Sequence, residues 1–199
     1  HRTSRRQRQM CIRDRICMKK DQFKSPDHYD LDLLLTDEQL MVRSSVRDWV
    51  KGNVSPIIED AVLMENFPKE FIQGLANIGA FGSFLPVKYG GSGLDFISYG
   101  LMMQELERGD SSLRVLSSIQ TSLVMNSIYK YGSEDQKIKY LLPLSKGELI
   151  GSFGMTEPDH GSDPKSMKTK FVEKDDYFLI NGSKIWIGHA PICDMAVVW

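Results

Sequence analysis

The chain has 199 residues, which is enough for one large domain or two small ones with a core of their own. It is 41% hydrophobic and 26% charged with a net charge of −1, so nothing in the composition points to nucleic acid or an acidic polymer as a partner. No apolar run approaches the ~20 residues that a membrane span needs. The three cysteines, Cys11, Cys17 and Cys193, are too scattered for a disulfide framework and are not spaced like zinc ligands. We therefore expect no metal site and a reducing compartment.

The first twenty residues carry a net charge of +7, whereas the rest of the chain carries −8. A basic start of this kind is typical of a nucleic-acid arm or of a mitochondrial transit peptide. We favour a third interpretation, because the run from Arg5 to Arg15 resembles translated sequencing-adapter DNA. Residues 1–17 are then a non-native leader, and the native chain starts at Met18.

Residues 18–148 have the pattern of an all-α domain. Thr36 and Gln39 form a capping-box pattern, which predicts a helix that runs to about Val54. Apolar residues at three- and four-residue spacings predict further helices to about residue 148. These helices are expected at about 57–66, after Pro68, and at about 96–108, 112–131 and 133–146.

After Gly147 the apolar period changes from that of a helix to that of a strand. Asn181-Gly182 predicts a hairpin turn, with residues 183–188 as the return strand. We therefore predict an α+β chain, in which an N-terminal all-α helical domain is followed at 149–199 by the first part of an antiparallel β-barrel-like domain. We expect that this second domain is truncated, because the chain stops inside a strand. The strands are expected at about 149–155, 169–172, 177–180 and 195–199.

Residues 154–163 have the pattern of a strand that ends in a tight polar loop. Threonine, glycine and serine in such a loop can present several hydroxyl and backbone N–H donors to one anionic or carbonyl-rich ligand. Trp186 follows in the next motif, and a flat aromatic side chain beside such donors is what a bound flavin needs. The spacings of a phosphate loop and of a nicotinamide-binding Rossmann unit are both absent from the sequence.

These two motifs resemble the acyl-CoA dehydrogenase family, and within it the glutaryl-CoA dehydrogenases most closely. The resemblance covers about residues 30–199, with further support from residues 104–111 and 131–141. It implies FAD-dependent oxidation of an acyl-CoA thioester between Cα and Cβ, and for glutaryl-CoA a decarboxylation to crotonyl-CoA. It also implies electron transfer to an electron-transfer flavoprotein and a homotetramer for the full-length protein. The expected location is the bacterial cytoplasm, or the mitochondrial matrix if the basic leader is genuine.

The resemblance also implies roles for individual residues. Donors near Met155 and Thr156 serve the pyrimidine edge of the flavin, whereas Gly161 and Ser162 approach the pyrophosphate and the acyl-CoA. Trp186 packs against the isoalloxazine ring. Glu157 and Asp163 are interpreted as loop-shaping residues rather than as an acid–base pair. The implied cofactor-binding residues are Phe153, Gly154, Met155, Thr156, Gly161, Ser162, Trp186, Ile187 and Gly188.

The implied substrate-binding residues are Arg114, Val115 and Ser162, with Arg114 facing the distal carboxylate of a glutaryl chain. Three positions depart from the family pattern. Val115 stands where the glutaryl-CoA enzymes carry serine, Gly188 where threonine or serine is usual, and His160 where the broad family prefers a small residue.

The resemblance places the catalytic glutamate in a C-terminal helical domain that these 199 residues do not contain, so no catalytic residue is expected here. We therefore expect that the chain as given is inactive and binds FAD poorly. Two other enzyme types remain open, namely a short- or branched-chain acyl-CoA dehydrogenase and an acyl-CoA oxidase. A non-catalytic truncated binding protein is the alternative from another class.

Overall fold

The computed structural model describes residues 28–199, so the leader, Cys11, Cys17 and Met18 lie outside the described residues. The described residues fall into two compact units that divide after Leu35. The first unit contributes the 3-10 helix η1 (Leu31–Leu34). All the features discussed below belong to the second unit.

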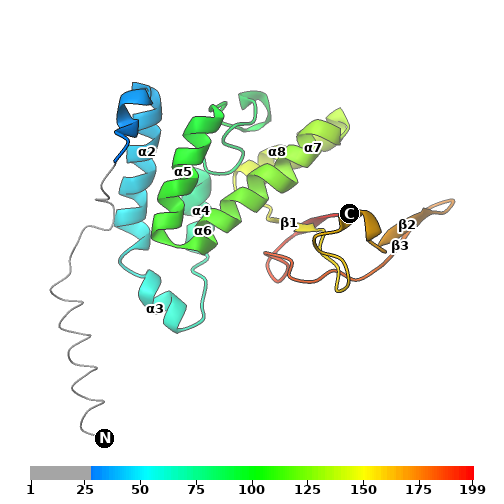
Figure 1. Cartoon of the computed structure of the whole chain (residues 1–199). Coiled ribbons are helices and arrows are strands. Elements are labelled where there is room, and N and C mark those ends of the chain that lie inside the picture. The colour runs from blue at the N-terminus through cyan, green and yellow to red at the C-terminus, as the bar shows by residue number, and fades with distance from the viewer. Residues whose placement is uncertain (1–27) are drawn as a thin grey trace, which may run out of the picture. The chain divides into compact units, whose positions relative to one another are not determined.

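The second unit begins with helices, as the sequence pattern predicts (Figure 1). The expected capping box of Thr36 and Gln39 is present, and the helix expected from residue 133 also begins with a capping box, formed by Ser133 and Gln136. The expected helix at 112–131 is continuous in the chain but contains a π-helical segment. The helical elements are α2 (Asp37–Trp49), η2 (Val50–Val54), α3 (Ile58–Leu63), α4 (Glu70–Asn77), η3 (Val87–Tyr89), α5 (Phe96–Gly109), α6 (Ser111–Ser118), η4 (Ile119–Met125), α7 (Asn126–Tyr131) and α8 (Glu134–Ser145).

An ion pair joins α2 to α5, which lie side by side (Figure 1). The fully buried Glu105 carboxylate accepts hydrogen bonds from Arg47 Nε at 2.9 Å and from Arg47 Nη2 at 2.8 Å. This bidentate geometry suits a buried carboxylate, which is costly to leave without a partner. The apolar core surrounds it and includes Val46, Val50, Phe71, Leu75, Met102, Leu106, Leu113, Leu116, Val124, Met125, Leu141 and Leu144.

Four short strands follow the helices. They are β1 (Gly151–Gly154), β2 (Lys170–Glu173), β3 (Phe178–Asn181) and β4 (Met195–Val198), with the 3-10 helix η5 (Pro164–Ser166) between β1 and β2. β2 and β3 form an antiparallel hairpin, as expected for this part of the chain. β1 and β4 instead pair in parallel, because the long crossover through β2 and β3 returns β4 in the same direction as β1.

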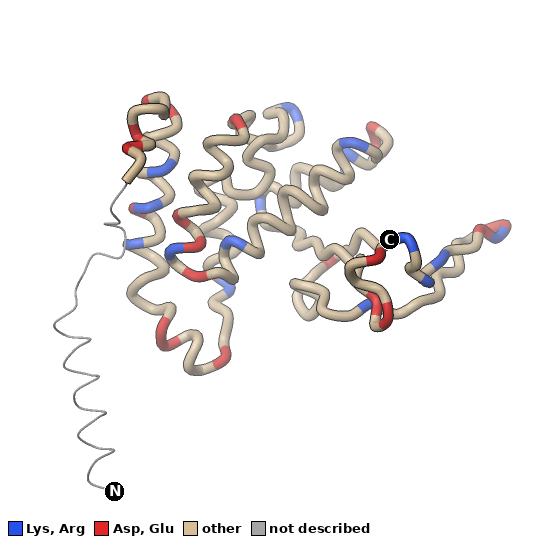
Figure 2. Tube along the Cα trace, viewed as in Figure 1, with Lys and Arg blue, Asp and Glu red and all other residues tan. Residues whose placement is uncertain are grey.

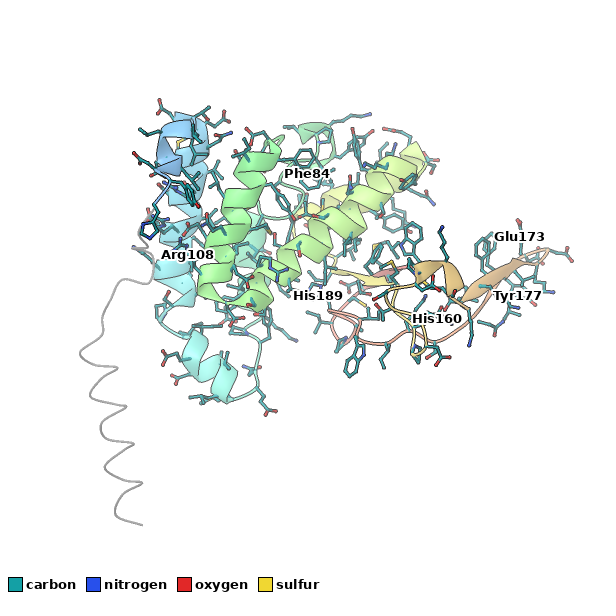
Figure 3. All side chains as sticks on the ribbon, in the orientation of Figure 1. Phe84, Arg108, His160, Glu173, Tyr177 and His189 are labelled. Carbon is teal, nitrogen blue, oxygen red and sulfur yellow. The ribbon has the colours of Figure 1, made fainter. Side chains whose placement is uncertain are left out.

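The prediction of a hairpin turn at Asn181-Gly182 is wrong. The turn lies earlier, where Lys174 N donates to Tyr177 O at 2.8 Å, and Figure 3 shows Glu173 and Tyr177 at the outer end of this hairpin. Asn181 ends β3, and the expected return strand at 183–188 forms no strand. Gly182 is needed for a close approach rather than for a turn, because a Cβ at this position would collide with Thr169.

Gln120 joins the helical layer to the strands. Its fully buried side chain donates from Nε2 to Leu144 O at 2.9 Å and to Leu149 O at 2.8 Å. Its Oε1 accepts from Gly151 N, the first residue of β1, at 2.9 Å. Gly151 itself packs so closely on η4 that a Cβ there would lie 2.6 Å from Cγ1 of Val124. The start of β1 is therefore set by one residue of the π-helical segment.

We expect that Gln120→Ala lowers the free energy of unfolding by about 2–4 kcal/mol, because three backbone groups each lose a hydrogen bond to the buried amide. Urea denaturation of the chain, followed by circular dichroism, measures this change. Gln73→Ala is the matched control, since Gln73 is exposed and bonds only to Asn77 and Lys146. The control should change stability by less than about 0.5 kcal/mol. An equal loss in both variants would contradict the role of Gln120.

Candidate functional site

The polar loop after β1 folds back on itself. Glu157 N donates to His160 O at 2.9 Å, and His160 N donates to Glu157 O at 3.2 Å. A Cβ at Gly161 would lie 3.8 Å from the Thr156 methyl group. The turn therefore brings Thr156 close to Gly161, two residues that the sequence assigns to the same ligand.

The segment at 183–188 lies against this loop. Ile185 N donates to Thr156 O at 2.9 Å. Lys184 Nζ donates to Met155 O at 2.9 Å and to Glu157 Oε1 at 3.0 Å. The Lys184 and Glu157 side chains are only 12% and 5% exposed. The two motifs that the sequence singles out are thus held together by a backbone hydrogen bond and a shielded ion pair.

Glu157 anchors this arrangement. Its carboxylate accepts from Lys168 N and from Thr169 N, both at 2.7 Å, in addition to Lys184. The Lys168 N–H, then the Thr169 side chain and the other donors, hold the pKa of Glu157 well below its usual range. Asp163 is also engaged locally, because its carboxylate accepts from the Ser166 hydroxyl. These contacts agree with the interpretation of both acids as loop-shaping residues.

Trp186 stands out because it is 87% exposed and has a left-handed backbone with φ of 60°. An exposed indole offers a flat apolar face that a planar ligand can cover. Within the described part of the chain, the neighbouring Thr156 hydroxyl forms no hydrogen bond. The exposed indole and the Thr156 hydroxyl, which lie on two segments joined by a backbone hydrogen bond, fit a planar ligand with polar edges.

The remaining cofactor-binding candidates lie on both sides of this surface. Phe153 contacts Trp199 at a ring-centroid distance of 5.9 Å, and Met155 is 36% exposed. Gly154 is buried in β1, Ile187 is half-buried, and Gly161 and Ser162 are exposed. The structure therefore gathers the loop and the Trp186 segment, while Phe153 turns to the end of the chain.

Gly188 lies close to η4. A Cβ at Gly188 would lie 2.6 Å from Cδ1 of Ile119 in η4. A threonine or serine at this position would therefore require the end of the Ile119 side chain to move. In this chain the turn after Trp186 presses against the helix instead.

The three substrate-binding candidates are not brought together. Arg114 Nε donates to Glu107 Oε2 at 2.7 Å, and this contact lowers the pKa of Glu107. Val115 lines a cavity of about 150 Å³ beside His189, and Ser162 lies in the exposed loop. Ser118, one helical turn after Arg114, carries a hydroxyl on the same side of α6, and this hydroxyl donates to Val115 O at 3.1 Å.

Sequence reasoning missed Lys184 and Glu107 as functional partners. The only sequence signal for Lys184 was a single base in the second motif and three acids, Glu157, Asp159 and Asp163, in the first. No sequence signal paired Arg114 with Glu107, because these residues lie on different helices.

Other kinds of site find no support in residues 28–199. Within this range, no three His, Cys, Asp or Glu residues are grouped so that they could hold a metal ion. No helix of the same range is both long and apolar enough to cross a membrane. Figure 2 shows acidic and basic residues interspersed along the helices, with acids such as Glu59 and Asp60 on α3.

We expect that Glu157→Gln lowers the melting temperature at neutral pH, because a neutral amide loses the ion pair with Lys184. The depressed pKa means that ionised Glu157 stabilises the fold above its ordinary pKa of 4.5, and this contribution is lost as the pH falls further. The melting-temperature difference between wild type and variant should therefore shrink below about pH 4.5. Differential scanning calorimetry at several pH values measures it.

Glu173→Gln, in the exposed outer part of the β2–β3 hairpin, is the control and should follow the wild type at every pH (Figure 3). A difference for Glu157→Gln that stays constant down to about pH 3 would rule out an ionised carboxylate as the anchor.

Comparisons with known proteins identify the family of both parts of the chain. The family model "Acyl-CoA dehydrogenase, N-terminal domain" matches residues 36–148, and the model "Acyl-CoA dehydrogenase, middle domain" matches residues 152–199. The boundary between the two matches falls where Gln120 binds the start of β1.

Three similar proteins illustrate the range of relatives. The short-chain-specific acyl-CoA dehydrogenase of Clostridium acetobutylicum is 38% identical over 85% of this chain and 45% of its own length. The glutaryl-CoA dehydrogenase of Mycobacterium smegmatis, solved in complex with FADH2, has a TM-score of 0.83 and 40% identity, covering 86% of this chain and 44% of its own. A chain in a structure of the electron transferring flavoprotein of Acidaminococcus fermentans has a TM-score of 0.78 and 35% identity, covering 82% and 43%.

The chain spans less than half the length of these relatives. The two family models together nevertheless cover most of its residues, in the order in which the helices and strands occur. The chain therefore belongs to the acyl-CoA dehydrogenase family.

Proposed function

We propose that the complete protein is an FAD-dependent acyl-CoA dehydrogenase that oxidises an acyl-CoA thioester between Cα and Cβ. The observation that carries this proposal is the contact between the loop after β1 and the Trp186 segment. The Lys184–Glu157 ion pair holds the two together and leaves Trp186 and the Thr156 hydroxyl open. This arrangement fits a flavin, and the FADH2 complex of the M. smegmatis relative supports the choice of cofactor.

FAD, when bound, supplies the acceptor for the β-hydride. In this proposal Trp186 stacks on the ring system, and Met155 and Thr156 donate to its polar edge. Ile187 and Gly188 lie near the reacting part of the ring. The other proposed cofactor contacts are Phe153, Gly154, Gly161 and Ser162.

We propose glutaryl-CoA as the substrate, with decarboxylation to crotonyl-CoA. Arg114 is the proposed partner of the distal carboxylate, with Val115 and Ser162 as further substrate contacts. The Arg114 and Glu107 side chains are 38% and 45% exposed, and pairs this exposed to water are weak. A substrate carboxylate can therefore compete with Glu107 for the guanidinium group. The 40% identity to a glutaryl-CoA dehydrogenase supports this choice.

A short-chain acyl-CoA is the second candidate substrate. It is favoured by the 38% identity to the short-chain-specific enzyme of C. acetobutylicum and by the absence of a hydroxyl at Val115. Without a distal carboxylate, Arg114 would simply remain paired with Glu107.

The wider context of the proposal follows the family. In this proposal residues 18–148 belong to the helical domain and residues 149–199 to the middle β domain. The catalytic base belongs to a further helical domain, so the 199 residues alone should be inactive. An electron-transfer flavoprotein is the proposed acceptor of the electrons. The similarity to a chain in the structure of the A. fermentans electron transferring flavoprotein supports this proposal. A homotetramer in the bacterial cytoplasm is the proposed state of the complete protein.

In the complete protein, we expect that Arg114→Ala lowers kcat/KM for glutaryl-CoA on the order of 10- to 100-fold, because a charge-assisted contact is lost. The kcat/KM for butyryl-CoA should change by less than about threefold, since butyryl-CoA has no distal carboxylate. Steady-state assays with a dye acceptor measure both values.

Lys130→Ala, at an exposed position on α7, is the control and should leave both substrates unaffected. An equally small change for the two substrates would favour a short-chain acyl-CoA as the substrate, and equally large losses would contradict a contact between Arg114 and the distal carboxylate. If neither substrate is turned over and no flavin is bound, the enzyme proposal fails and a binding protein remains.

A further inference from the structure

His189 occupies the junction between the helical layer and the strands. It lies in the turn that follows the Trp186 segment and lines the cavity of about 150 Å³ that Val115 and Leu116 of α6 also line (Figure 3). Phe67, Ser112 and Ile192 complete the lining. The imidazole is therefore surrounded mainly by apolar side chains, and its Nδ1 lies 3.4 Å from Gly151 O of β1.

Charged groups do not face this imidazole in the described part of the chain. On α6, Arg114 pairs with Glu107, and Asp110 caps the helix start by accepting from Ser112 N. In the turn that holds His189, Asp194 accepts from Ile150 N at 2.8 Å. The free thiol of Cys193 donates to Ala190 O. A proton on the imidazole would thus find no carboxylate among the residues that line this cavity.

The backbone of this segment needs to be held in place. Residues 28–199 include four non-glycine residues with positive φ, and two of them are Trp186 with 60° and His189 with 65°. Residues other than glycine rarely adopt this backbone conformation unless surrounding contacts impose it. Gly188, between them, is pressed against Ile119 of η4. The segment therefore depends on its packing against the helices.

We infer that His189 is a positioning residue, which holds the Trp186–Gly188 segment against α6 and η4 as a neutral imidazole and releases it when protonated. Burial of the imidazole lowers the pKa of His189 below its ordinary value of 6.5, which agrees with a preference for the neutral form. Because the folded-state pKa is the lower one, the stabilising contribution is present above pH 6.5 and is lost as the pH falls through the folded-state value.

The consequence for the enzyme rests on the proposed function. Trp186 is the proposed stacking partner of the flavin, so release of its segment would weaken cofactor binding in mild acid. The release itself is a property of this chain and needs no flavin. It can therefore be tested whether or not the chain binds FAD.

The test uses the 199-residue chain labelled with 5-fluorotryptophan and followed by fluorine NMR from about pH 8 to about pH 5. The chain has three tryptophans, and Trp186→Phe assigns the resonance of interest. Proton–carbon correlation NMR spectra of the histidine rings in the same samples give the titration midpoint of His189. We expect a midpoint below 6.5 and a shift of the Trp186 resonance with the same midpoint, whereas Trp49 in α2 stays unchanged.

Substitutions separate His189 from other titrating groups. In His189→Asn the Trp186 resonance should keep its neutral-pH position throughout, and His189→Gln provides a second variant if the first does not fold. His160→Asn, in the loop after β1, is the matched histidine control and should leave the shift intact. A Trp186 resonance that stays still while His189 titrates would overturn the inference, as would a shift that persists in both His189 variants.

Discussion

The buried amide of Gln120 is the interaction on which the rest of the structure depends. It occupies a π-helical segment, and such segments often mark functional positions in longer helices. Its three hydrogen bonds fix the end of α8, the connection at Leu149 and the first residue of β1. Because β1 leads directly into the polar loop, the position of Thr156 follows from that of Gln120.

A second set of contacts joins the loop after β1 to the Trp186 segment, and together these two segments form the proposed flavin surface. Lys184 and Glu157 connect the loop after β1 to the segment that carries Trp186. The same η4 segment contacts the turn after Trp186 through Ile119 and Gly188. The helical layer thus positions both sides of the proposed flavin surface, once through β1 and once through the turn at His189.

Sequence patterns predicted the helical part of the fold well. Capping boxes and apolar periodicity depend on local chemistry, so Thr36 with Gln39 and Ser133 with Gln136 located two helix starts correctly. The prediction of a turn at Asn181-Gly182 was wrong. Glycine is needed at position 182 because of a close, non-local approach to Thr169, and not because of a local turn preference. Gln120, Lys184 and Glu107 were not predicted for the same reason, since their partners lie far away in the sequence or on another helix.

The central claim is that this chain forms part of a flavin site that serves acyl-CoA oxidation. The most direct measurement is an anaerobic titration of the complete protein with glutaryl-CoA, followed by visible absorbance. We predict that the protein carries bound FAD and that glutaryl-CoA bleaches its oxidised absorbance band. A complete protein that binds no flavin, or a flavin band that glutaryl-CoA and butyryl-CoA both leave unchanged, would contradict it.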